Sequence, residues 1–559
     1  MATIISHNII SPLGLSSNDN FKALLEGVSS IVSCQGVHEG MRPYSASLFT
    51  AEANKELAIE GYSRYEALSI QSIKKALEGV DFDLSSSETC LILSTTKGNI
   101  EQLEKDCSIN ISPASAAQRI ADFFEIKTTP ITVCNACISG VSAMLLAQRL
   151  VDAGVYKNIV VCGCDVQCEF IISGFQSLNA VSPNPCCPFD IERIGLSLGE
   201  AVATVIVSQS HASAGWKIIK GCVRNDAYHN TTPSPVGEGC CMALSQLALK
   251  NNDDIAFINA HGTATMFNDQ MESKAIESAD LSHLPVNALK GYFGHTMGAA
   301  GIIESIISME ALDAGVILGT KGFSIKGVSG KVNVITQPVK TNKKSFVKII
   351  SGFGGCNGAL LMSKETHNND QSKLSEYKKI STIKIVNNRV LINGAELEVA
   401  NEGKALLKEL YTKYIGNYPK FHKMDLLCQL GFVAIQILLK DLESEAKRNL
   451  AIALFNSSSS IATDKEYIKT IADKDNYFPS PALFVYTLPN IVLSEVAIKE
   501  GINGETTMYL LPQKDEYVMT QVAKSTFADN DVKEMVVGWI DCFNESNFIA
   551  ELSIIKKLE

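Results

Sequence analysis

A cysteine at the start of a predicted helix is the first residue whose position suggests chemistry. Cys137 stands in the run Asn135–Gly140 (NACISG), between a short strand-like segment and the helical pattern of Ser139–Ala153. A thiol at a helix N-terminus lies near free backbone N–H groups and the positive end of the helix dipole, and both favour the thiolate. The same N–H groups can hold the oxyanion that forms when a thioester is attacked. Cys137 is therefore a candidate nucleophile for acyl transfer.

Two histidines further along the chain have comparable settings. His261 opens HGTATMFND directly after the strand-like run Ile255–Ala260, and the carboxyl ends of strands are where α/β proteins usually bind ligands. His295 lies in KGYFGHTMGAAG, five residues after Lys290 and just before a Gly/Ala-rich helical pattern. Taken singly, each histidine could be a buried structural residue, which is the commoner role for a lone histidine at such a place.

The order of these motifs resembles that of the β-ketoacyl-acyl-carrier-protein synthases. The matching runs are NACISG, HGTATMFND, KGYFGHTMGAAG and SGFGGCN, and PFDIERIGLSLGEA and the opening IISPLG also look like that family. SGFGGCN is a glycine loop after a strand, without the lysine or the spacing of a phosphate-binding loop. The resemblance spans residues 1–365. It implies a thiolase-like α/β fold, with two duplicated halves in a five-layer αβαβα core and usually a dimer.

The resemblance also implies a Cys-His-His site. Cys137 would take an acyl chain from a carrier protein as a thioester. His261 and His295 would promote decarboxylation of malonyl-carrier protein, and the carbanion would attack the acyl group and lengthen it by two carbons. The backbone N–H groups of Cys137 and Phe353 would form the oxyanion hole. This is the reaction of an acyltransferase of class EC 2.3.1.

Further residues match positions with supporting roles in that family. Lys290 and Glu304 would hold the second histidine region, each charge satisfying the other in a buried site; the alternative for Lys290 is a solvated surface lysine. Phe353 matches a gate between acyl-binding and malonyl-binding conformations. The positions that match contacts with the pantetheine arm or the acyl chain are Thr263, Thr265, Ile138 and Phe353.

No permanently bound cofactor or metal is expected. The 4′-phosphopantetheine arm would be supplied by the acyl carrier protein, the expected partner. Cys134-x-x-Cys137 has no matching second pair of the kind that structural zinc sites use. Most of the 16 cysteines stand in apolar runs, where a cysteine is usually a small buried hydrophobe.

The overall composition bears on the kind of partner and on the location that are expected for this chain. The chain has 559 residues, with 49 Lys and Arg against 60 Asp and Glu, a formal net charge of −11. That balance disfavours nucleic acid or an anionic membrane as the main partner. No uninterrupted apolar run reaches the ~18 residues that suggest a membrane span, and the N-terminus lacks a signal-peptide pattern. A cytoplasmic location is therefore expected.

The chain is longer than one ketosynthase module, and the excess resembles a partial second copy. Residues 366–384 are polar and lysine-rich and are predicted to be a linker, which leaves a second unit at 385–559. Several of its runs parallel runs of the first copy, and the stretch from Ala147 to Lys157 parallels the stretch from Ala523 to Lys533 at a constant offset of 376, which carries Cys137 onto Gln513. A glutamine there resembles chain-length factors, the catalytically silent partners of ketosynthases in polyketide and aryl-polyene systems, because an amide cannot form an acyl-enzyme.

In this second unit the pattern predicts helices over Met424–Leu442 and Ala482–Lys499, and strands over Leu450–Phe455 and Val532–Ile540. The unit is expected to dock on residues 1–365, within one chain as a pseudo-heterodimer or between two chains of a homodimer. The favoured function is elongating ketosynthase in polyene or polyketide-type biosynthesis. The alternatives are housekeeping fatty-acid elongation and, in a different class, a non-catalytic scaffold or chain-length-controlling subunit. A thiolase or a Cys-His hydrolase fits the motifs less well.

Overall fold

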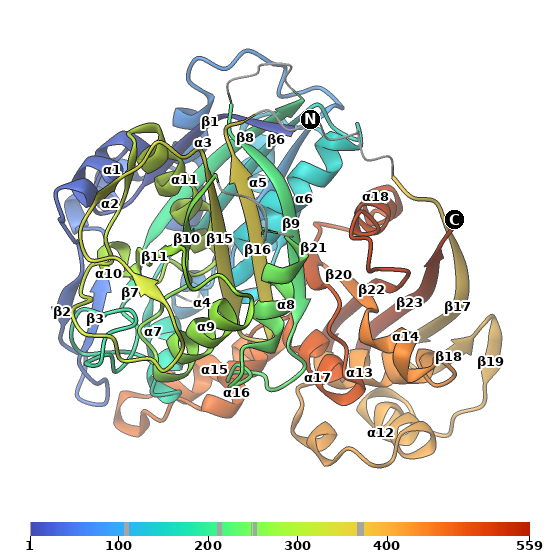
Figure 1. Cartoon of the computed structure of the whole chain (residues 1–559). Helices are drawn as coiled ribbons and strands as arrows, with labels where there is room; N and C mark the ends of the chain where they lie inside the picture. The colour runs from blue at the N-terminus through green and yellow to red at the C-terminus, as the bar shows by residue number, and fades with distance from the viewer. Residues whose placement is uncertain are drawn as a thin grey trace.

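The computed structural model describes residues 2–105, 111–209, 215–247, 249, 254–365 and 374–558. The strands gather mainly in two sheets, with helices on and between them (Figure 1). Within these ranges the larger sheet has the order β1-β8-β6-β4-β5-β21-β20-β22-β23-β17-β18-β19, and the smaller has the order β13-β11-β10-β15-β16-β9. The larger sheet therefore joins strands from both ends of the chain.

Five strands from the first part of the chain make one half of the larger sheet. They are β1 (Ala2–Ile10), β8 (Ala201–Gln209), β6 (Asn158–Asp165), β4 (Thr89–Ser94) and β5 (Ile131–Val133). Strand β4 pairs in parallel with both β5 and β6 and is buried along its whole length, as its apolar run TCLILS predicts. Helices α3 (Arg64–Leu77) and α5 (Pro113–Phe123) pack on the outer face, and α6 (Ser139–Asp152) packs on the inner face.

The smaller sheet completes a layered core. Its strands are β13 (Asn333–Val334), β11 (Pro285–Asn287), β10 (Ile255–Asn259), β15 (Ser345–Gly352), β16 (Cys356–Ser363) and β9 (Lys217–Asn225). Helix α11 (Ala300–Asp313) lies with α6 between the two sheets, while α8 (Glu238–Gln246) and α9 (Met266–Ser278) pack outside. The predicted αβαβα layering is confirmed.

Shorter elements complete this first segment (residues 2–365). They are α1 (Ser17–Leu25), β2 (Val32–Cys34), β3 (Tyr44–Ser47), α2 (Ala51–Leu57), α4 (Glu101–Glu104), η1 (Ala136–Ile138), α7 (Glu169–Ser177), β7 (Leu198–Gly199), α10 (Lys290–Phe293), η3 (Met297–Ala299), β12 (Val316–Ile317) and β14 (Val339–Lys340).

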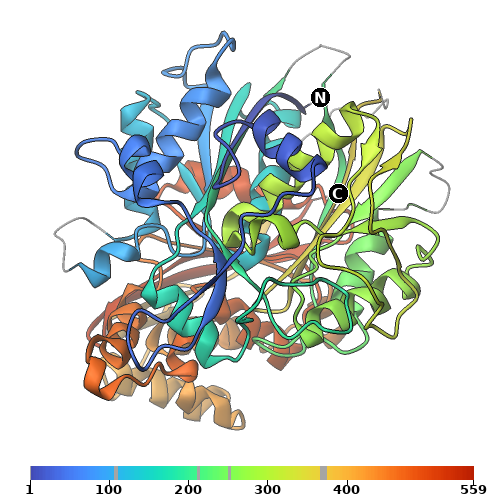
Figure 2. The same ribbon diagram turned by 90° about the vertical axis from the view of Figure 1, so that its left-hand side faces the viewer.

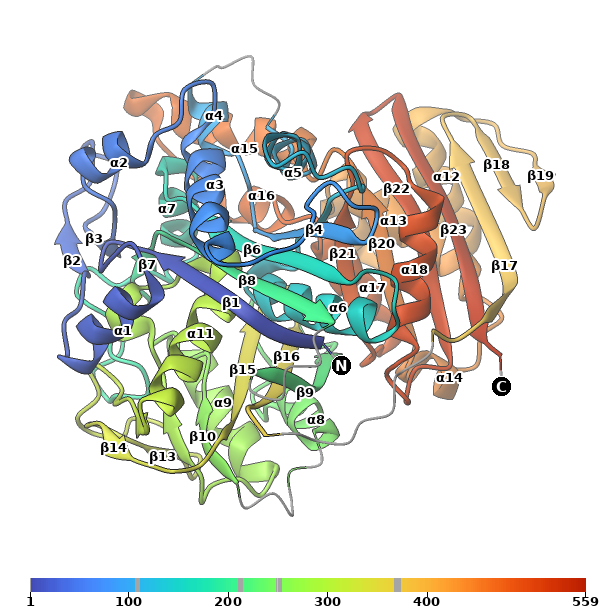
Figure 3. The ribbon, with the colours of Figure 1, turned by 90° about the horizontal axis from the view of Figure 1, so that it is seen from above.

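The C-terminal segment (residues 377–558) continues the larger sheet without a break (Figure 3). Its strands are β17 (Tyr377–Val386), β18 (Arg389–Ile392), β19 (Ala395–Leu397), β20 (Ala451–Asn456), β21 (Thr506–Leu510), β22 (Glu534–Asn544) and β23 (Asn547–Lys557). Strand β21 pairs antiparallel with β5, with Thr132 opposite Leu510 and Val133 opposite Tyr509. The predicted docking of the two segments therefore takes place within one chain.

In Figure 2 the orange ribbons at the lower left, beside the first segment, belong to helices of the C-terminal segment. This segment has both short and long helices. They are α12 (Gly403–Tyr414), η4 (Pro419–Lys423), α13 (Leu426–Leu438), α14 (Ser444–Arg448), α15 (Ile461–Ala472), η5 (Lys474–Asn476), α16 (Pro481–Tyr486), α17 (Ile491–Glu500) and α18 (Glu516–Thr526). Helix α18 packs against α6 in the centre of the molecule.

The C-terminal segment repeats the element order of the first. Strand β20, strand β21, helix α18 and strand β22 follow one another as β4, β5, α6 and β6 do. The two copies share a detail at the ends of their strands. Asp165 at the end of β6 accepts a hydrogen bond from the Thr95 hydroxyl at 2.7 Å, and Asp541 in β22 accepts one from the Ser457 hydroxyl at 2.6 Å. The repeat seen in the sequence is a structural repeat.

Two expectations need correction. The predicted linker, 366–384, overlaps β17, which begins at Tyr377 and pairs with β23, so its lysine-rich run is partly a strand with one solvated face; residues 366–373 lie outside the described part. The helix predicted over Ala482–Lys499 is two helices, α16 and α17. Pro489 explains the break between them, because proline lacks an N–H and disfavours helical geometry in the residue before it.

None of the helices in the described ranges is long and apolar enough to cross a membrane.

Candidate active site

Cys137 stands on the turn that opens helix α6. It belongs to the short helix η1, and the residue before it, Ala136, has a left-handed φ of 49°, a conformation that non-glycine residues rarely adopt. The Cys137 side chain is buried, and burial raises the pKa of its thiol to about 12. The positive charge of Lys290 and the backbone N–H groups of Cys137 and Phe353 act against that rise. The turn therefore aims the thiol at groups that stabilise negative charge.

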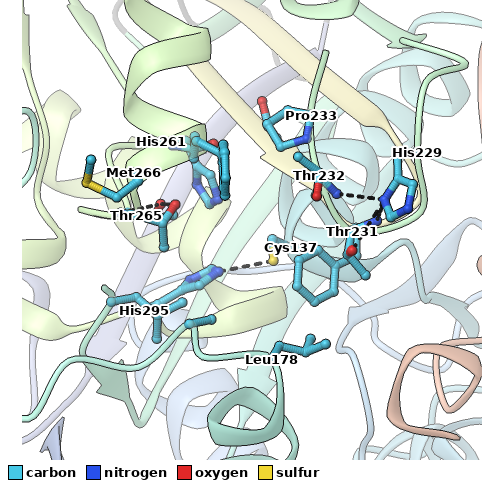
Figure 4. Close-up of a pocket in the computed structure, with 18 of the residues that line it drawn as sticks. Cys137, Leu178, His229, Thr231, Thr232, Pro233, His261, Thr265, Met266 and His295 are labelled. Atoms are coloured by element: carbon cyan, nitrogen blue, oxygen red, sulfur yellow. Dashed lines mark hydrogen bonds between the residues drawn. The ribbon is translucent and has the colours of Figure 1, made fainter. Parts of the chain in front are cut away.

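His295 touches this thiol. Its Nε2 lies 3.0 Å from Cys137 Sγ, the dashed line in Figure 4. The backbone N–H of Met297 donates to His295 Nδ1 at 3.3 Å, so Nδ1 is the unprotonated nitrogen and Nε2 carries the proton toward the sulfur. Burial, with help from the Lys290 charge, lowers the pKa of His295 well below its ordinary value. The imidazole is therefore neutral at physiological pH.

His261 faces the same point from the end of β10. Its ring lies 5.1 Å from that of His295, centroid to centroid, at 81°. Glu272 fixes the turn, because its carboxylate accepts the backbone N–H groups of His261 and Gly262 at 2.6 and 2.7 Å. Burial and the Lys290 charge also lower the pKa of His261 well below its ordinary value. One nitrogen of each histidine and the sulfur of Cys137 lie within 4.8 Å of one another.

A buried cluster of charges supports the histidines. Lys290 Nζ lies 2.6 Å from Glu304 Oε1 and donates to the carbonyl of His261 at 2.7 Å. Lys348 Nζ lies 2.6 Å from the other oxygen of Glu304. Lys290 and Glu304 meet as predicted, but Lys348 was missed, although a single lysine inside the apolar strand FVKII was a usable signal. The pair is buried, so the surface alternative for Lys290 is wrong.

A cavity of about 270 Å³ opens in front of these residues (Figure 4). Thr263 and Thr265 line it, with their hydroxyls 2.9 Å apart. Thr263 is buried and Thr265 is partly exposed. Ile138 is placed differently from our expectation: it is fully buried in the core and is not among the residues that line this cavity. Its neighbour Cys137 takes the face toward the cavity, so Ile138 packs behind it.

Phe353 lies at the inner end of the cavity. Its ring stacks on Phe175, with centroids 5.9 Å apart. Beyond it is a far smaller space, lined on one side by Cys137 and Phe353 and on the other by Lys97 and by Phe484 of the C-terminal segment. Phe353 thus lines both spaces. Lys97 and Phe484 were not singled out in the sequence, because nothing local shows that the two segments meet here.

Gln513 lies on the exposed loop between β21 and α18. Within each copy the two strands fix the register: Ser94 pairs with Val133, and Asn456 pairs with Leu510. This register gives an offset of 377 and points to Lys514 as the counterpart of Cys137, whereas Asp165 and Asp541 keep the offset of 376 that points to Gln513. Lys514 is also exposed and contacts Glu516 and Glu551 at 2.7 and 2.5 Å. The catalytic turn therefore has a solvated counterpart in the second copy.

Comparison with known proteins assigns the family. The profile of the β-ketoacyl synthase N-terminal domain matches residues 3–212, and that of the C-terminal domain matches 217–324. The chain belongs to the β-ketoacyl synthase family. It is 31% identical over 273 residues to 3-oxoacyl-[acyl-carrier-protein] synthase 2 of Rhizobium meliloti, an alignment that covers 45% of this chain and 64% of that protein. It is 26% identical over 410 residues to the enzyme of the same name from Coxiella burnetii, covering 64% of this chain and 96% of that protein.

Among solved structures, the likeness to a keto synthase-chain length factor extends over the whole chain. The PfaC keto synthase-chain length factor superposes with a TM-score of 0.74 at 14% identity, covering 100% of this chain and 78% of that one. At this identity the likeness concerns the fold alone. It includes the C-terminal segment, which lies outside the two matched family domains.

Proposed function

We propose that this protein catalyses the decarboxylative condensation of a malonyl group, held on an acyl carrier protein, with an acyl chain held as a thioester on Cys137. The carrier would supply the 4′-phosphopantetheine arm. The observation that carries the proposal is the meeting of one thiol and two neutral imidazoles, within 4.8 Å of one another, at the inner end of a cavity. Two neutral N–H donors beside a nucleophilic sulfur suit this reaction.

In the first half-reaction Cys137 Sγ attacks the thioester carbonyl of the acyl donor. The negative charge that develops on the carbonyl oxygen is held by the N–H groups of Cys137 and Phe353. The S–C bond to pantetheine breaks, and the thiol proton of Cys137 ends on the departing pantetheine sulfur. The entry of a new acyl group requires the thiol to face the cavity, as it does here.

In the second half-reaction the malonyl thioester loses CO₂, and its C–C bond electrons form an enolate. His261 and His295 donate hydrogen bonds to the enolate oxygen, and both can do so because burial keeps them neutral and protonated on one nitrogen. The enolate carbon attacks the acyl carbonyl, a C–C bond forms, and Cys137 leaves as the thiolate, which takes up a proton. The product is a β-ketoacyl group two carbons longer.

The C-terminal segment supports a specialised role. We infer that it serves as a built-in, catalytically silent partner of the chain-length-factor kind, in polyene or polyketide-type synthesis. Its counterpart of the catalytic turn carries no cysteine, and it contributes Phe484 and Leu488 to the lining of the small space behind Cys137. Housekeeping fatty-acid elongation is the second candidate, favoured by the names of the relatives.

We also propose that the chain works as a monomer with one active site. The edge of β5 is paired with β21 within the chain, so it is not free to pair with a second molecule. On this account residues 1–365 form the ketosynthase unit, and the second unit begins at β17.

Intact mass spectrometry tests the proposed function. After incubation with a carrier protein that is loaded with an acyl chain, the wild-type protein should gain the mass of one acyl group. The Cys137→Ala variant should gain none. The His295→Ala variant should still be acylated yet fail to release CO₂ from malonyl-carrier protein. An acyl adduct that persists in Cys137→Ala would place the nucleophile on another cysteine and refute the assignment.

A further inference from the structure

Two loops close over Cys137, and both are bonded to one helix of the C-terminal segment. We name them the Asn225 loop (residues 225–231) and the Phe353 loop (residues 352–356). Both line the cavity in front of the cysteine. Helix α17 and Asn490, the residue at its start, lie against the two loops.

The first contact joins α17 to the gate residue itself. Asn490 Nδ2 donates a hydrogen bond to the carbonyl of Phe353 at 2.9 Å. The approach is close, since a Cβ on Gly354 would stand 2.7 Å from Asn490 Nδ2, and Gly354 has a φ of 94° that favours glycine. The glycine that follows Phe353 therefore makes room for a side chain of the other segment.

The second contact reaches the Phe353 loop through the Asn225 loop. The Gly354 N–H donates to the carbonyl of Asn230 at 2.7 Å. The side chain of Asn230 is held at both ends by α17, because its Nδ2 donates to Glu495 Oε1 at 2.7 Å and its Oδ1 accepts from Ser494 Oγ at 2.7 Å. These two bonds hold the Asn230 side chain in one orientation. They therefore also fix the backbone carbonyl of Asn230, which accepts the Gly354 N–H.

Glu495 is itself held in place within the C-terminal segment. It is buried, and its carboxylate accepts the hydroxyls of Tyr486 at 3.0 Å and Tyr418 at 3.2 Å. These bonds come from residues before α13 and before α17 in the chain. The contact with Asn230 is therefore part of a rigid network and not a surface pair.

These contacts affect the reacting atoms through the two backbone groups of Phe353, its carbonyl and its N–H. Its carbonyl is bonded to Asn490, and its N–H is directed at Cys137, where it favours the thiolate and lowers the thiol pKa. Gly352, on the other side, lies so close that a Cβ there would be 3.2 Å from the Cys137 nitrogen. A shift of the Phe353 loop would displace one of the two oxyanion donors.

We propose that Asn490 and Glu495 are positioning residues, through which the C-terminal segment sets the place of the Phe353 N–H beside Cys137 and so the rate of acyl transfer. The proposal rests on the acyl-transfer function given above. It assigns the C-terminal segment a part in the chemistry of the first segment, in addition to any effect on chain length.

The test compares Asn490→Ala, Asn490→Asp, Glu495→Ala and Glu495→Gln with the full-length wild type. Asn490→Asp keeps the size but removes the donor, and Glu495→Gln keeps an acceptor for Asn230. Misplacing a reacting group by about 1 Å can cost about a hundredfold. We expect acylation kcat to fall between about tenfold and a hundredfold in the first three variants, with KM within about twofold, and Glu495→Gln to remain near wild type. Asn476→Ala, at an exposed asparagine of the same segment, is the matched control.

A second readout needs no carrier protein. The rate of Cys137 alkylation by iodoacetamide, followed against pH, should shift to higher pH in Asn490→Ala and Asn490→Asp, because the thiolate loses an N–H donor. If either variant does not fold, the other and Ser494→Ala provide the comparison. Wild-type kcat and an unshifted alkylation profile in the Asn490 variants would overturn the proposal. If the wild type is not acylated at all, the proposed function fails, and the alkylation profile alone still decides the positioning role.

Discussion

At the scale of single residues, burial determines the chemistry of the three site residues. It raises the pKa of Cys137 and lowers those of His261 and His295, so the uncharged forms of all three dominate at neutral pH. Lys290 is the nearby cation that stabilises the thiolate and opposes imidazolium. That these three residues form one site could be predicted from their motifs and the order of the motifs in the sequence. Their protonation could not, because it depends on which residues cover the site.

Replacing Lys290 with Met tests this electrostatic role. Without the cation the pKa values of both histidines should rise and that of Cys137 should rise as well. The histidines would then become protonated at a higher pH, so on acidification malonyl decarboxylation should be lost at a higher pH than in the wild type. Alkylation of Cys137 should require a more alkaline pH. Lys348 remains to pair with Glu304, so the fold should persist. Superimposable pH profiles in the two proteins would contradict the role of Lys290.

A second prediction at this scale concerns the buried ion pair between the segments. Lys97 Nζ lies 2.5 Å from Asp464 Oδ1 and also donates to the Ser460 hydroxyl at 3.3 Å. Removing one partner of a buried pair leaves an uncompensated charge, so Lys97→Ala should lose about 3–5 kcal/mol of the free energy of unfolding in urea. Burial raises the pKa of Asp464 to about 6, above its unfolded value, so its ionised form costs stability as pH rises through that range. Lys97 lowers this pKa, so in the variant the pKa of Asp464 should rise further and the carboxyl should stay neutral to a higher pH. The deficit of the variant should therefore shrink as the pH falls towards about 6; a constant deficit above about pH 6 would count against this explanation.

At the scale of elements, the site depends on the close crossing of two central helices. A Cβ on Gly301 of α11 would lie 2.8 Å from the Val141 nitrogen of α6, and one on Gly140 would lie 2.9 Å from the Gly298 carbonyl. Cys137 and His295 stand just before these helices, so the crossing brings the sulfur and the imidazole together. Strands β4 and β6 and helices α5, α6 and α11 could be predicted from their apolar patterns. The pairing of β5 with β21 could not, because a three-residue strand carries no local signal of its partner.

Gly301→Val should separate these two helices. We expect a loss of about 1–3 kcal/mol in unfolding free energy, the usual cost of overpacking, together with a drop in condensation rate larger than the drop in acylation rate. The second effect follows because His295, which acts in decarboxylation, stands just before α11. Stopped-flow acylation and CO₂ release, measured on the same preparation, give the two rates. Equal effects on both steps would show that the helix crossing does not position His295.

At the scale of the whole molecule, one and a half copies of a ketosynthase fold share one continuous sheet. The length of the chain and the faint repeat predicted this arrangement in outline. The sequence did not reveal how the segments meet, since the contacts involve residues far apart, such as Arg149 with Glu505 at 2.9 Å and Arg224 with Asp529.

Removing residues 377–559 tests this arrangement. The truncation would expose the edge of β5 and the apolar surface that now contacts α16, α17 and α18. The truncated protein should aggregate or pair with itself, whereas the full-length chain should elute as a monomer in light-scattering chromatography. A soluble truncated monomer with unchanged products would show that the C-terminal segment is dispensable.

The most direct test of the account is a single turnover on the carrier protein. Full-length protein, first acylated on Cys137, is mixed with malonyl-carrier protein, and the mass of the carrier is followed. We expect the malonyl group to be replaced by a β-ketoacyl group that contains the acyl chain plus two carbons, with loss of one CO₂. Cys137→Ala and the His261→Ala/His295→Ala double variant should give no such product. Formation of the β-ketoacyl carrier by Cys137→Ala at the wild-type rate would contradict the account.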